Sequence, residues 1–458
     1  ADDSDVINQV DSKKDKYEEI EHNVYLNQLK DVASIWLMAS FHIHAKNDLF
    51  AGASIIPDEP KYYEIIKKIG VIDNLPDWTS FLGDKLYNTV KQYQKENKVF
   101  HWELEFPEII GDGFEAVVGN PPYVVINEEK YLGVDLNCNK SRNLFALISE
   151  NSIKFINNNF YNAFIIPQSG FSSSTMISFQ EMLKNNAKSL YINNFSWRPD
   201  KIFESANLPI SIYIIRKFIK YKENLVYTTN YIRWNKNERK NIFNKIQFIK
   251  SNQFIDNCQG FYPKIGNTIE ISILEKMLSN KKINYYLSKN KNDKNYIYFR
   301  TSGGLYFKLF TDFSTGSRKE TYFNLSSDEY KKILIAVLNS NLFFWYYDVF
   351  SNCRDLSLYN ISCFPLDLDK INSSIKNDLF KISSDLMNDF IKNSTNEVRN
   401  YKSIGELKCS TFYIRKSKTL IDNVDNIIAR HYNFDQKELN YIINYNIKYR
   451  SDEIKEEE

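Results

Sequence analysis

A strand that runs into two consecutive prolines is the feature that most constrains this chain. Residues 114–119 are apolar and typical of a buried strand, and Asn120, Pro121, Pro122 and Tyr123 follow directly. Each proline ring fixes φ and removes a backbone donor, so the strand has to end there and the geometry of the turn is set in advance. We therefore predict a turn that presents one amide and one exposed aromatic ring.

This turn suits a planar amino group. An exocyclic amine such as N6 of adenine is a poor nucleophile, because its lone pair is delocalised into the ring until acceptors bind its hydrogens. The side-chain oxygen of Asn120 and the carbonyl of Pro121 could be those acceptors, held in place by the prolines. Tyr123 would stack on the flat base. Taken alone, the tetrapeptide is better explained by an ordinary turn after a strand.

The surroundings of the motif make a specific resemblance. The chain resembles DNA adenine N6-methyltransferases of the large single-chain restriction–modification (type IIG) kind and related phage-exclusion methyltransferases. Segments similar to that family occur in the family's order along the chain. They are an approach segment (101–108), an amphipathic helix (143–148), a buried strand (162–169), a loop (195–203) and a hairpin strand (208–215). Together they cover residues 100–220.

The resemblance implies an α/β fold with four regions. Residues 1–99, mostly helical by their periodicity, would be a helical insertion of the methyltransferase domain. Residues 100–225 would be the catalytic half, the second half of a Rossmann-like methyltransferase sheet. Residues 226–370, with mixed strands and aromatic turns, resemble an α+β target-recognition domain, and residues 371–458 are expected to form a C-terminal helical region.

The cofactor motif of the family is not found ahead of Asn120. The family binds S-adenosylmethionine with a glycine-rich turn after its first strand, because only glycine lets the backbone approach the cofactor closely. Of the glycine pairs available, Gly111 and Gly113 precede a strand, and Gly303 and Gly304 lie far downstream. We therefore expect the chain to begin inside the methyltransferase domain, with S-adenosylmethionine bound mainly by a missing N-terminal part, from the same gene or a partner subunit. The cofactor-binding residues stay unknown.

Composition favours a cytoplasmic globular protein. With 43% hydrophobic and 15% aromatic residues in 458 positions, the chain can bury cores for two or three domains. The five cysteines show no CxxC spacing, so neither a disulfide framework nor a zinc site is indicated. No apolar stretch is long enough to span a bilayer, and we expect no membrane contact.

Double-stranded DNA is the expected partner, although the net charge is only +2. The stretch from Arg216 to Lys250 interleaves cations with aromatics, and Arg233 and Lys236 are its candidate phosphate contacts. A solvated helix face explains this stretch equally well. Arg318 and Lys319 are the leading DNA contacts, because Gly316 permits a tight turn and two cations could reach phosphate or a guanine edge.

Other candidate sites are rejected. His42 and His44 would point to different faces of a helix, so no metal site is predicted. Asp112 and Glu115 are interpreted as surface charges, because the methylated amine can lose its proton to solvent. The aromatic block at residues 338–347 is interpreted as core packing.

Three functions remain open on the sequence. The first is DNA adenine methylation of a base flipped out of the duplex. The second is a DNA-binding specificity module without catalysis. The third, methylation of a protein glutamine, is disfavoured by the large second domain, since such enzymes need no duplex reader.

Overall fold

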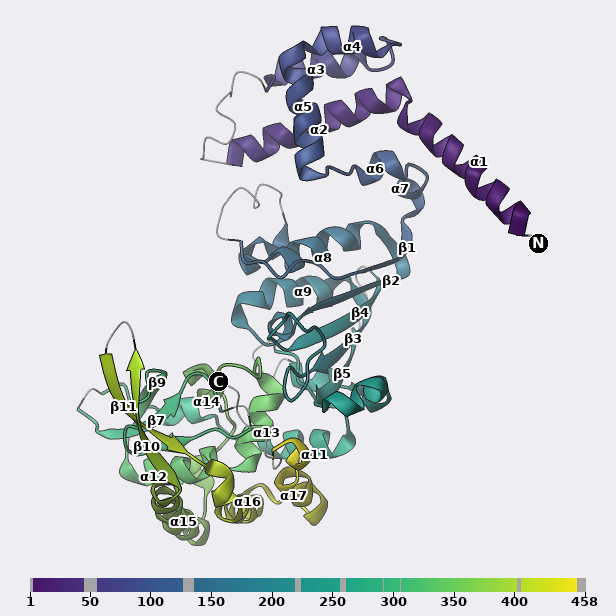
Figure 1. Cartoon of the computed structure of the whole chain (residues 1–458). Coiled ribbons are helices and arrows are strands. Elements are labelled where there is room, and N and C mark those ends of the chain that lie inside the picture. The colour runs from purple at the N-terminus through teal and green to yellow at the C-terminus, as the bar shows by residue number, and fades with distance from the viewer. Residues whose placement is uncertain are drawn as a thin grey trace.

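The computed structural model describes residues 3–44, 56–126, 136–218, 224–255, 261–290, 292–304, 306–401 and 405–450. Three parts follow one another along the chain: helices, a six-stranded sheet, and a mixed region of helices and short strands (Figure 1). Helices packed on a mixed central sheet confirm the α/β class.

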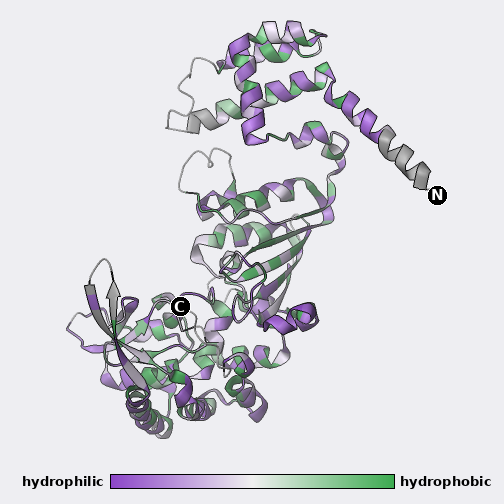
Figure 2. Ribbon diagram, in the orientation of Figure 1, coloured by the Kyte–Doolittle hydropathy of each residue, from purple (hydrophilic) through white to green (hydrophobic). Residues whose placement is uncertain are grey.

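The N-terminal part is helical, as predicted for residues 1–99. Its elements are α1 (Asp3–Glu21), α2 (Val24–His44), α3 (Glu59–Lys68), α4 (Leu75–Leu82), α5 (Asp84–Asn97) and the short α6 (Trp102–Glu105) and α7 (Ile109–Asp112). Asp58 and Asn74 cap α3 and α4 with their side chains, and a proline stands in the first turn of each. The helices pack on a small core around the buried Trp78, whose indole donates to Asp31 over 3.1 Å. Helix α1 projects from this bundle and is largely hydrophilic where Figure 2 colours it.

The central sheet has the strand order β1-β2-β4-β3-β5-β6. Its strands are β1 (Phe114–Gly119), β2 (Ile156–Pro167), β3 (Ala187–Phe195), β4 (Ile210–Lys217), β5 (Leu225–Ile232) and the short β6 (Ile249–Lys250). Strands β1 and β2 pair in parallel, as do β3 and β5, whereas β4 runs antiparallel between β2 and β3. The strands β1, β2, β3 and β5 therefore run the same way, and their carboxyl ends meet at one edge.

One face of this sheet is covered by two helices. Helix α8 (Leu144–Lys154), capped by Asn143 as its sequence predicts, and α9 (Ile177–Asn186) pack on the apolar side chains of β2, β3 and β4. Tyr213 lies at the centre of this core, and its hydroxyl donates to Asn162 over 2.8 Å. Alternation along the strands sends the intervening side chains to the opposite face.

That opposite face is only partly covered within the described residues. Val118 on β1 is 77% exposed, and Tyr161 and Ile214 on β2 and β4 are exposed as well. Strands joined by parallel crossover helices, as β1 and β2 are by α8, normally lie in sheets with both faces covered. Strand β1 also pairs with β2 alone among the described strands, so its outer edge carries unpaired backbone groups.

The C-terminal part is built around an apolar core. It contains a three-stranded sheet, β8-β7-β9, made of β7 (Asn295–Arg300), β8 (Phe310–Thr311) and β9 (Glu320–Leu325). Its helices are α10 (Asn252–Ile255), α11 (Thr268–Leu278), α12 (Asp328–Leu338), α13 (Asn341–Phe350), α14 (Leu358–Ser362), α15 (Ser373–Lys392), α16 (Lys418–Tyr432), α17 (Gln436–Ile443) and α18 (Ile447–Arg450).

The aromatic block is core, as its composition predicts. Every residue of α13 is buried, and Phe343 packs edge-on against Phe310 at 5.3 Å and against Phe364 at 5.4 Å. In the part of the chain that the structure describes, no single helix is long and apolar enough to cross a membrane. Among the described helices, only α12 and α13 taken together have the length and apolar composition of a membrane span, and they are bent by 75° where they meet.

The prediction of helices alone beyond residue 371 is wrong in one segment. Strands β10 (Ser394–Tyr401) and β11 (Gly405–Phe412) form an antiparallel ribbon that projects from the C-terminal part (Figure 1). The backbone amide of Ser410 donates to the carbonyl of Thr315 over 3.1 Å, which ties the ribbon to the β8–β9 loop. Thr395 and Val398 are β-branched, but most residues of the two strands are polar, so pairing between the strands stabilises the ribbon.

The exposed edge of β1 predicts a change in association behaviour. Replacing Val118 with lysine should lower self-association of the chain while leaving its unfolding midpoint nearly unchanged, because a charge on an exposed edge strand disfavours strand pairing. Light scattering across protein concentrations measures this. Val71→Lys is the matched control, since Val71 is 66% exposed but lies in a turn between α3 and α4. Equal effects of the two substitutions would contradict a role for the β1 edge.

Candidate active site

The Asn-Pro-Pro-Tyr motif lies directly beyond the carboxyl end of β1. Gly119 pairs with Phe164 of β2, and an added Cβ at Gly119 would lie 3.1 Å from the Phe164 ring, so a glycine suits this close approach. Pro121 is buried and anchors the turn, whereas Asn120 and Pro122 are exposed. The turn thus leaves β1 at the sheet edge where ligands bind in open α/β folds.

Tyr123 is tied to the amide of Asn120. Its hydroxyl lies 2.8 Å from Oδ1 of Asn120 and 3.1 Å from the carbonyl oxygen of Ile165 on β2. Burial raises the pKa of Tyr123 to about 12, so the hydroxyl keeps its proton at neutral pH. A phenol has one proton to donate, so only one of the two oxygens accepts a full hydrogen bond. Donation to Ile165 leaves the oxygen of Asn120 available to another donor.

The loop after β3 adds an aromatic and a cation to the same edge. Trp197 follows the buried Phe195 and Ser196, and the guanidinium of Arg198 lies 5.1 Å from the centroid of the Trp197 ring. Arg198 is exposed. Neither residue was predicted as a site residue, although an aromatic next to a cation directly after an apolar strand is the signal that would have found them.

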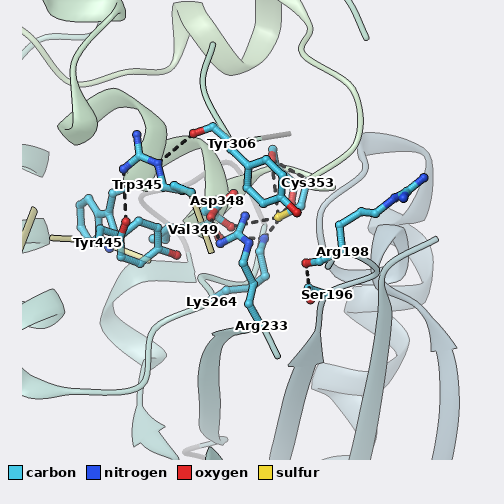
Figure 3. A network of polar contacts seen from close by, with 12 residues as sticks. Ser196, Arg198, Arg233, Lys264, Tyr306, Trp345, Asp348, Val349, Cys353 and Tyr445 are labelled. Atoms are coloured by element: carbon cyan, nitrogen blue, oxygen red, sulfur yellow. Dashed lines mark hydrogen bonds and ion pairs between the residues drawn. The ribbon is translucent and has the colours of Figure 1, made fainter. Parts of the chain in front are cut away.

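Arg233 does not occupy the position predicted for a DNA contact. It follows β5, is only 5% exposed, and pairs with Asp348 of α13 over 2.6 Å (Figure 3). Burial by itself would lower the pKa of Arg233, but the Asp348 carboxylate outweighs it and the net shift is upward. A buried, ion-paired guanidinium cannot reach phosphate, so Arg233 joins the central sheet to the C-terminal part instead.

Three further buried cations surround this pair. Lys264 donates to the carbonyls of Val349 and Ser351, over 3.0 and 2.7 Å. The Arg450 guanidinium lies 4.3 Å from the Phe307 ring and 4.4 Å from the Phe344 ring. Lys308 stands 4.1 Å over the ring of Tyr347, and burial lowers its pKa to about 8. These contacts replace solvent around charges that are costly to bury.

The remaining predicted DNA contacts lie at the surface. Lys236 is exposed at the start of a short 3₁₀ segment after β5. Arg318 and Lys319 are exposed in the turn before β9, and Gly316 in that turn has a φ of +74°. The structure does not bring Lys236 together with Arg318 and Lys319 through any contact it describes. Of the basic stretch from Arg216 to Lys250, Lys217 is buried and donates to the carbonyl of Ile153.

The described residues do not fit a cofactor-binding turn. Gly113 has a φ of +66° and ends α7 directly before β1, so Gly111 and Gly113 form a helix-to-strand turn rather than the strand-to-helix turn that a nucleotide cofactor needs. Gly303 and Gly304 lie between β7 and β8. No cofactor contact is therefore assigned. Among the described side chains no cluster could hold a metal ion, and the side chains of His42 and His44 lie outside them.

Comparison with known proteins supports the resemblance drawn from the sequence. Residues 10–203 match the family described as Eco57I restriction-modification methylase. Over 140 residues the chain is 28% identical to a type II restriction enzyme and methyltransferase from Methanocaldococcus jannaschii, a match that covers 30% of this chain and 11% of that protein. The resemblance to a large restriction–modification methyltransferase is confirmed, and the chain corresponds to a small share of that relative's length.

Two solved structures match this chain at low identity and low TM-score. The type IIL restriction-modification enzyme MmeI in complex with DNA shares 13% identity, with 81% of this chain and 63% of that chain covered and a TM-score of 0.42. The type ISP enzyme LlaGI, a nuclease-deletion mutant in complex with a DNA substrate mimic, shares 12% identity over 72% and 40% of the two chains, with a TM-score of 0.36. The α/β class follows from the strand order of the central sheet and the helices that pack on it.

The buried junction predicts a large stability effect at Arg233. Arg233→Leu should lower the free energy of unfolding by about 3–5 kcal/mol, because it leaves the Asp348 carboxylate buried without its partner. Arg430→Leu, which breaks an exposed pair with Asp378, should cost at most about 1 kcal/mol. Urea-induced unfolding followed by tryptophan fluorescence measures both. A loss at Arg233 no larger than that at Arg430 would show that the junction pair is not a structural link.

Proposed function

We propose that the chain forms the modification and specificity part of a site-specific DNA adenine N6-methyltransferase in a restriction–modification system. The observation that carries this is the position of Asn120, Pro121, Pro122 and Tyr123 at the carboxyl edge of β1, within the segment that matches the methylase family. Its partner would be double-stranded DNA and its compartment the cytoplasm.

The geometry of the turn suits the chemistry of an aromatic amine. Asn120 is exposed and Pro121 follows it directly, so an amino group above the turn would donate one hydrogen to Oδ1 of Asn120 and the other to the carbonyl oxygen of Pro121. Both acceptors withdraw the hydrogens from the plane of the base and localise the lone pair on nitrogen. The prolines keep this arrangement rigid, so little reorganisation is needed when the base arrives.

Tyr123 has two tasks in this proposal. Its ring would stack on the flipped adenine, and its hydroxyl would donate to Ile165 while the adenine amino group takes its place at Oδ1 of Asn120. At 2.8 and 3.1 Å, both acceptors are within reach of the same hydroxyl. The amine becomes cationic on methylation and then loses its proton to solvent, so neither Asp112 nor Glu115 is needed as a base.

S-adenosylmethionine would supply the methyl group. Since the described residues do not form its binding turn, we propose that a further polypeptide holds the cofactor, pairs with the open edge of β1 and covers the sheet face that carries Val118 and Ile214. The four regions predicted from the sequence, with boundaries near residues 99, 225 and 370, belong to the same proposal.

A specificity module without catalysis is the second candidate. The large C-terminal part with the exposed Arg318 and Lys319 favours it, because such a module needs a DNA-binding surface but no amine-binding turn. Under that alternative the residues of the turn would have no effect on methylation.

Asn120→Ala separates the two candidates. In the intact enzyme it should abolish methyl transfer and leave DNA binding nearly unchanged, because Asn120 lies outside the β9 loop that we assign to DNA. Transfer of a radiolabelled methyl group and gel-shift affinity measure the two properties. Asn224→Ala is a control that removes an amide distant in sequence from the turn. Retention of more than a small fraction of the wild-type methylation rate in Asn120→Ala would sink the assignment.

The ring and the hydroxyl of Tyr123 can be separated by two substitutions. Tyr123→Ala should weaken capture of the flipped base by roughly 1–3 kcal/mol, the usual contribution of base–aromatic stacking. Tyr123→Phe should be mild, because the ring remains and Oδ1 of Asn120 is then always available. Fluorescence of 2-aminopurine at the target position reports base capture. A severe loss in Tyr123→Phe would show that the hydroxyl, and not the ring, is essential.

A further inference from the structure

Strand β9 forms an edge of the three-stranded sheet in the C-terminal part. Its inward side chains, Phe323 and Leu325, belong to the core. Tyr322 points outward and is 57% exposed. It lies opposite Tyr298 of β7 with 5.7 Å between the ring centroids, and 5.0 Å from the ring of Tyr296. Three tyrosines thus form a polar aromatic surface on the outer face of the sheet.

Two hollows flank Tyr322. One, of about 460 Å³, is lined by Lys319 together with Ser302 and Asp355. The other, of about 390 Å³, is lined by Arg318 together with Ser314 and Ser317. Thr321 and Tyr322 line both. Lys319 and Arg318 are neighbours in sequence, but they therefore line different hollows, one on each side of Tyr322.

The backbone of this edge is held in place. The carbonyl of Lys319 accepts from the amide of Thr301 over 2.8 Å, and the carboxylate of Glu320 accepts from the amide of Thr315 over 2.7 Å. Glu320 also accepts from the hydroxyl of Ser314. The Glu320 carboxylate is thereby hydrogen-bonded to the loop. These bonds hold the backbone that carries Arg318 and Lys319 in place.

The exposed charge around the hollows is mainly positive, because Glu320, the other carboxylate that lines them, is half-buried and hydrogen-bonded to the loop. Arg300, at the end of β7 on the outer face, adds a third exposed cation to Arg318 and Lys319, whereas Asp355 is the exposed carboxylate among the lining residues. A surface with cations on both sides of the exposed Tyr322 complements a nucleic-acid strand, whose charge repeats along its length.

We propose that the β9 edge binds the sugar–phosphate backbone of duplex DNA, with Arg318 and Lys319 each contacting a different phosphate from the two hollows and Tyr322 packing on the sugar between them. This inference rests on the proposed function, which supplies DNA as the partner. It adds to that function a surface in the C-terminal part that positions the DNA backbone. The two cations then act as separate phosphate contacts rather than as one base-reading pair.

The salt dependence of DNA binding tests this directly. With the 458-residue chain and a mixed-sequence duplex, Arg318→Gln and Lys319→Gln should each lower the slope of log affinity against log salt by about 1, and the double variant by about 2. Tyr322→Ala should weaken binding several-fold and leave the slope unchanged. Fluorescence anisotropy at a series of salt concentrations provides both quantities.

Matched controls lie away from the hollows. Lys381→Gln on α15 removes an exposed cation, and Tyr285→Ala removes a tyrosine that is 72% exposed; both should leave affinity and slope at wild-type values. Thermal unfolding midpoints confirm that all variants are folded. The inference is overturned if the wild-type chain does not bind the duplex, if the slopes of the Arg318 and Lys319 variants equal those of the controls, or if the substitutions alter self-association in place of DNA binding.

The outcome is independent of catalysis. Loss of methyl transfer in Asn120→Ala with unchanged slopes in the β9 variants would keep the proposed function and reject the surface. Changed slopes with full activity in Asn120→Ala would keep the surface and reject the catalytic assignment. An effect of Arg318→Gln confined to one duplex sequence would assign Arg318 to a base edge and overturn its phosphate role.

Discussion

Strand β4 determines where the chemistry of this chain can occur. It pairs antiparallel with β2 through seven registered positions from Tyr161 to Pro167, and with β3 on its other side. Because both neighbours run opposite to β4, they run parallel to each other and to β1. Their carboxyl ends are thereby brought to one edge, where Asn120, Tyr123 and Trp197 follow the strands. Without β4 in this position, the turn and the β3 loop would not share an edge.

The second constraint is electrostatic and lies where the central sheet meets the C-terminal part. Arg233 leaves the end of β5 and meets Asp348 on α13, so a strand of the sheet and the most apolar helix are joined by a buried ion pair. Removal of either partner would leave a charge in the interior. Such a link fixes the central sheet relative to the C-terminal part.

Local sequence signals predicted much of the fold. The apolar run at residues 114–119 is a strand that ends at its prolines, and Asn143 caps α8 as a residue with a short polar side chain does. The aromatic block is core because a helix with so many large rings is stable only when those rings are buried. Each of these features is determined by residues close to one another in the chain, so it can be predicted from the local sequence.

Features that depend on distant residues were missed. Arg233 looks like a phosphate contact in a basic stretch, and only the fold shows that Asp348, more than a hundred residues away, neutralises it. The β10–β11 ribbon lies between two helices and has few β-branched residues, so its strands depend on pairing with each other and on the bond between Ser410 and Thr315. Arg318 and Lys319 lie in the turn before β9 and line different hollows, and residues from β7 and from the segment at Asp355 complete those hollows.

The identity of the methylated nucleoside tests the central claim most directly. Duplex DNA incubated with the intact enzyme and S-adenosylmethionine can be digested to nucleosides and analysed by mass spectrometry. The account predicts N6-methyldeoxyadenosine as the product, formed with wild-type Asn120 and absent with Asn120→Ala. Methylated cytosine as the product, or no methylated nucleoside from DNA that the enzyme binds, would contradict it.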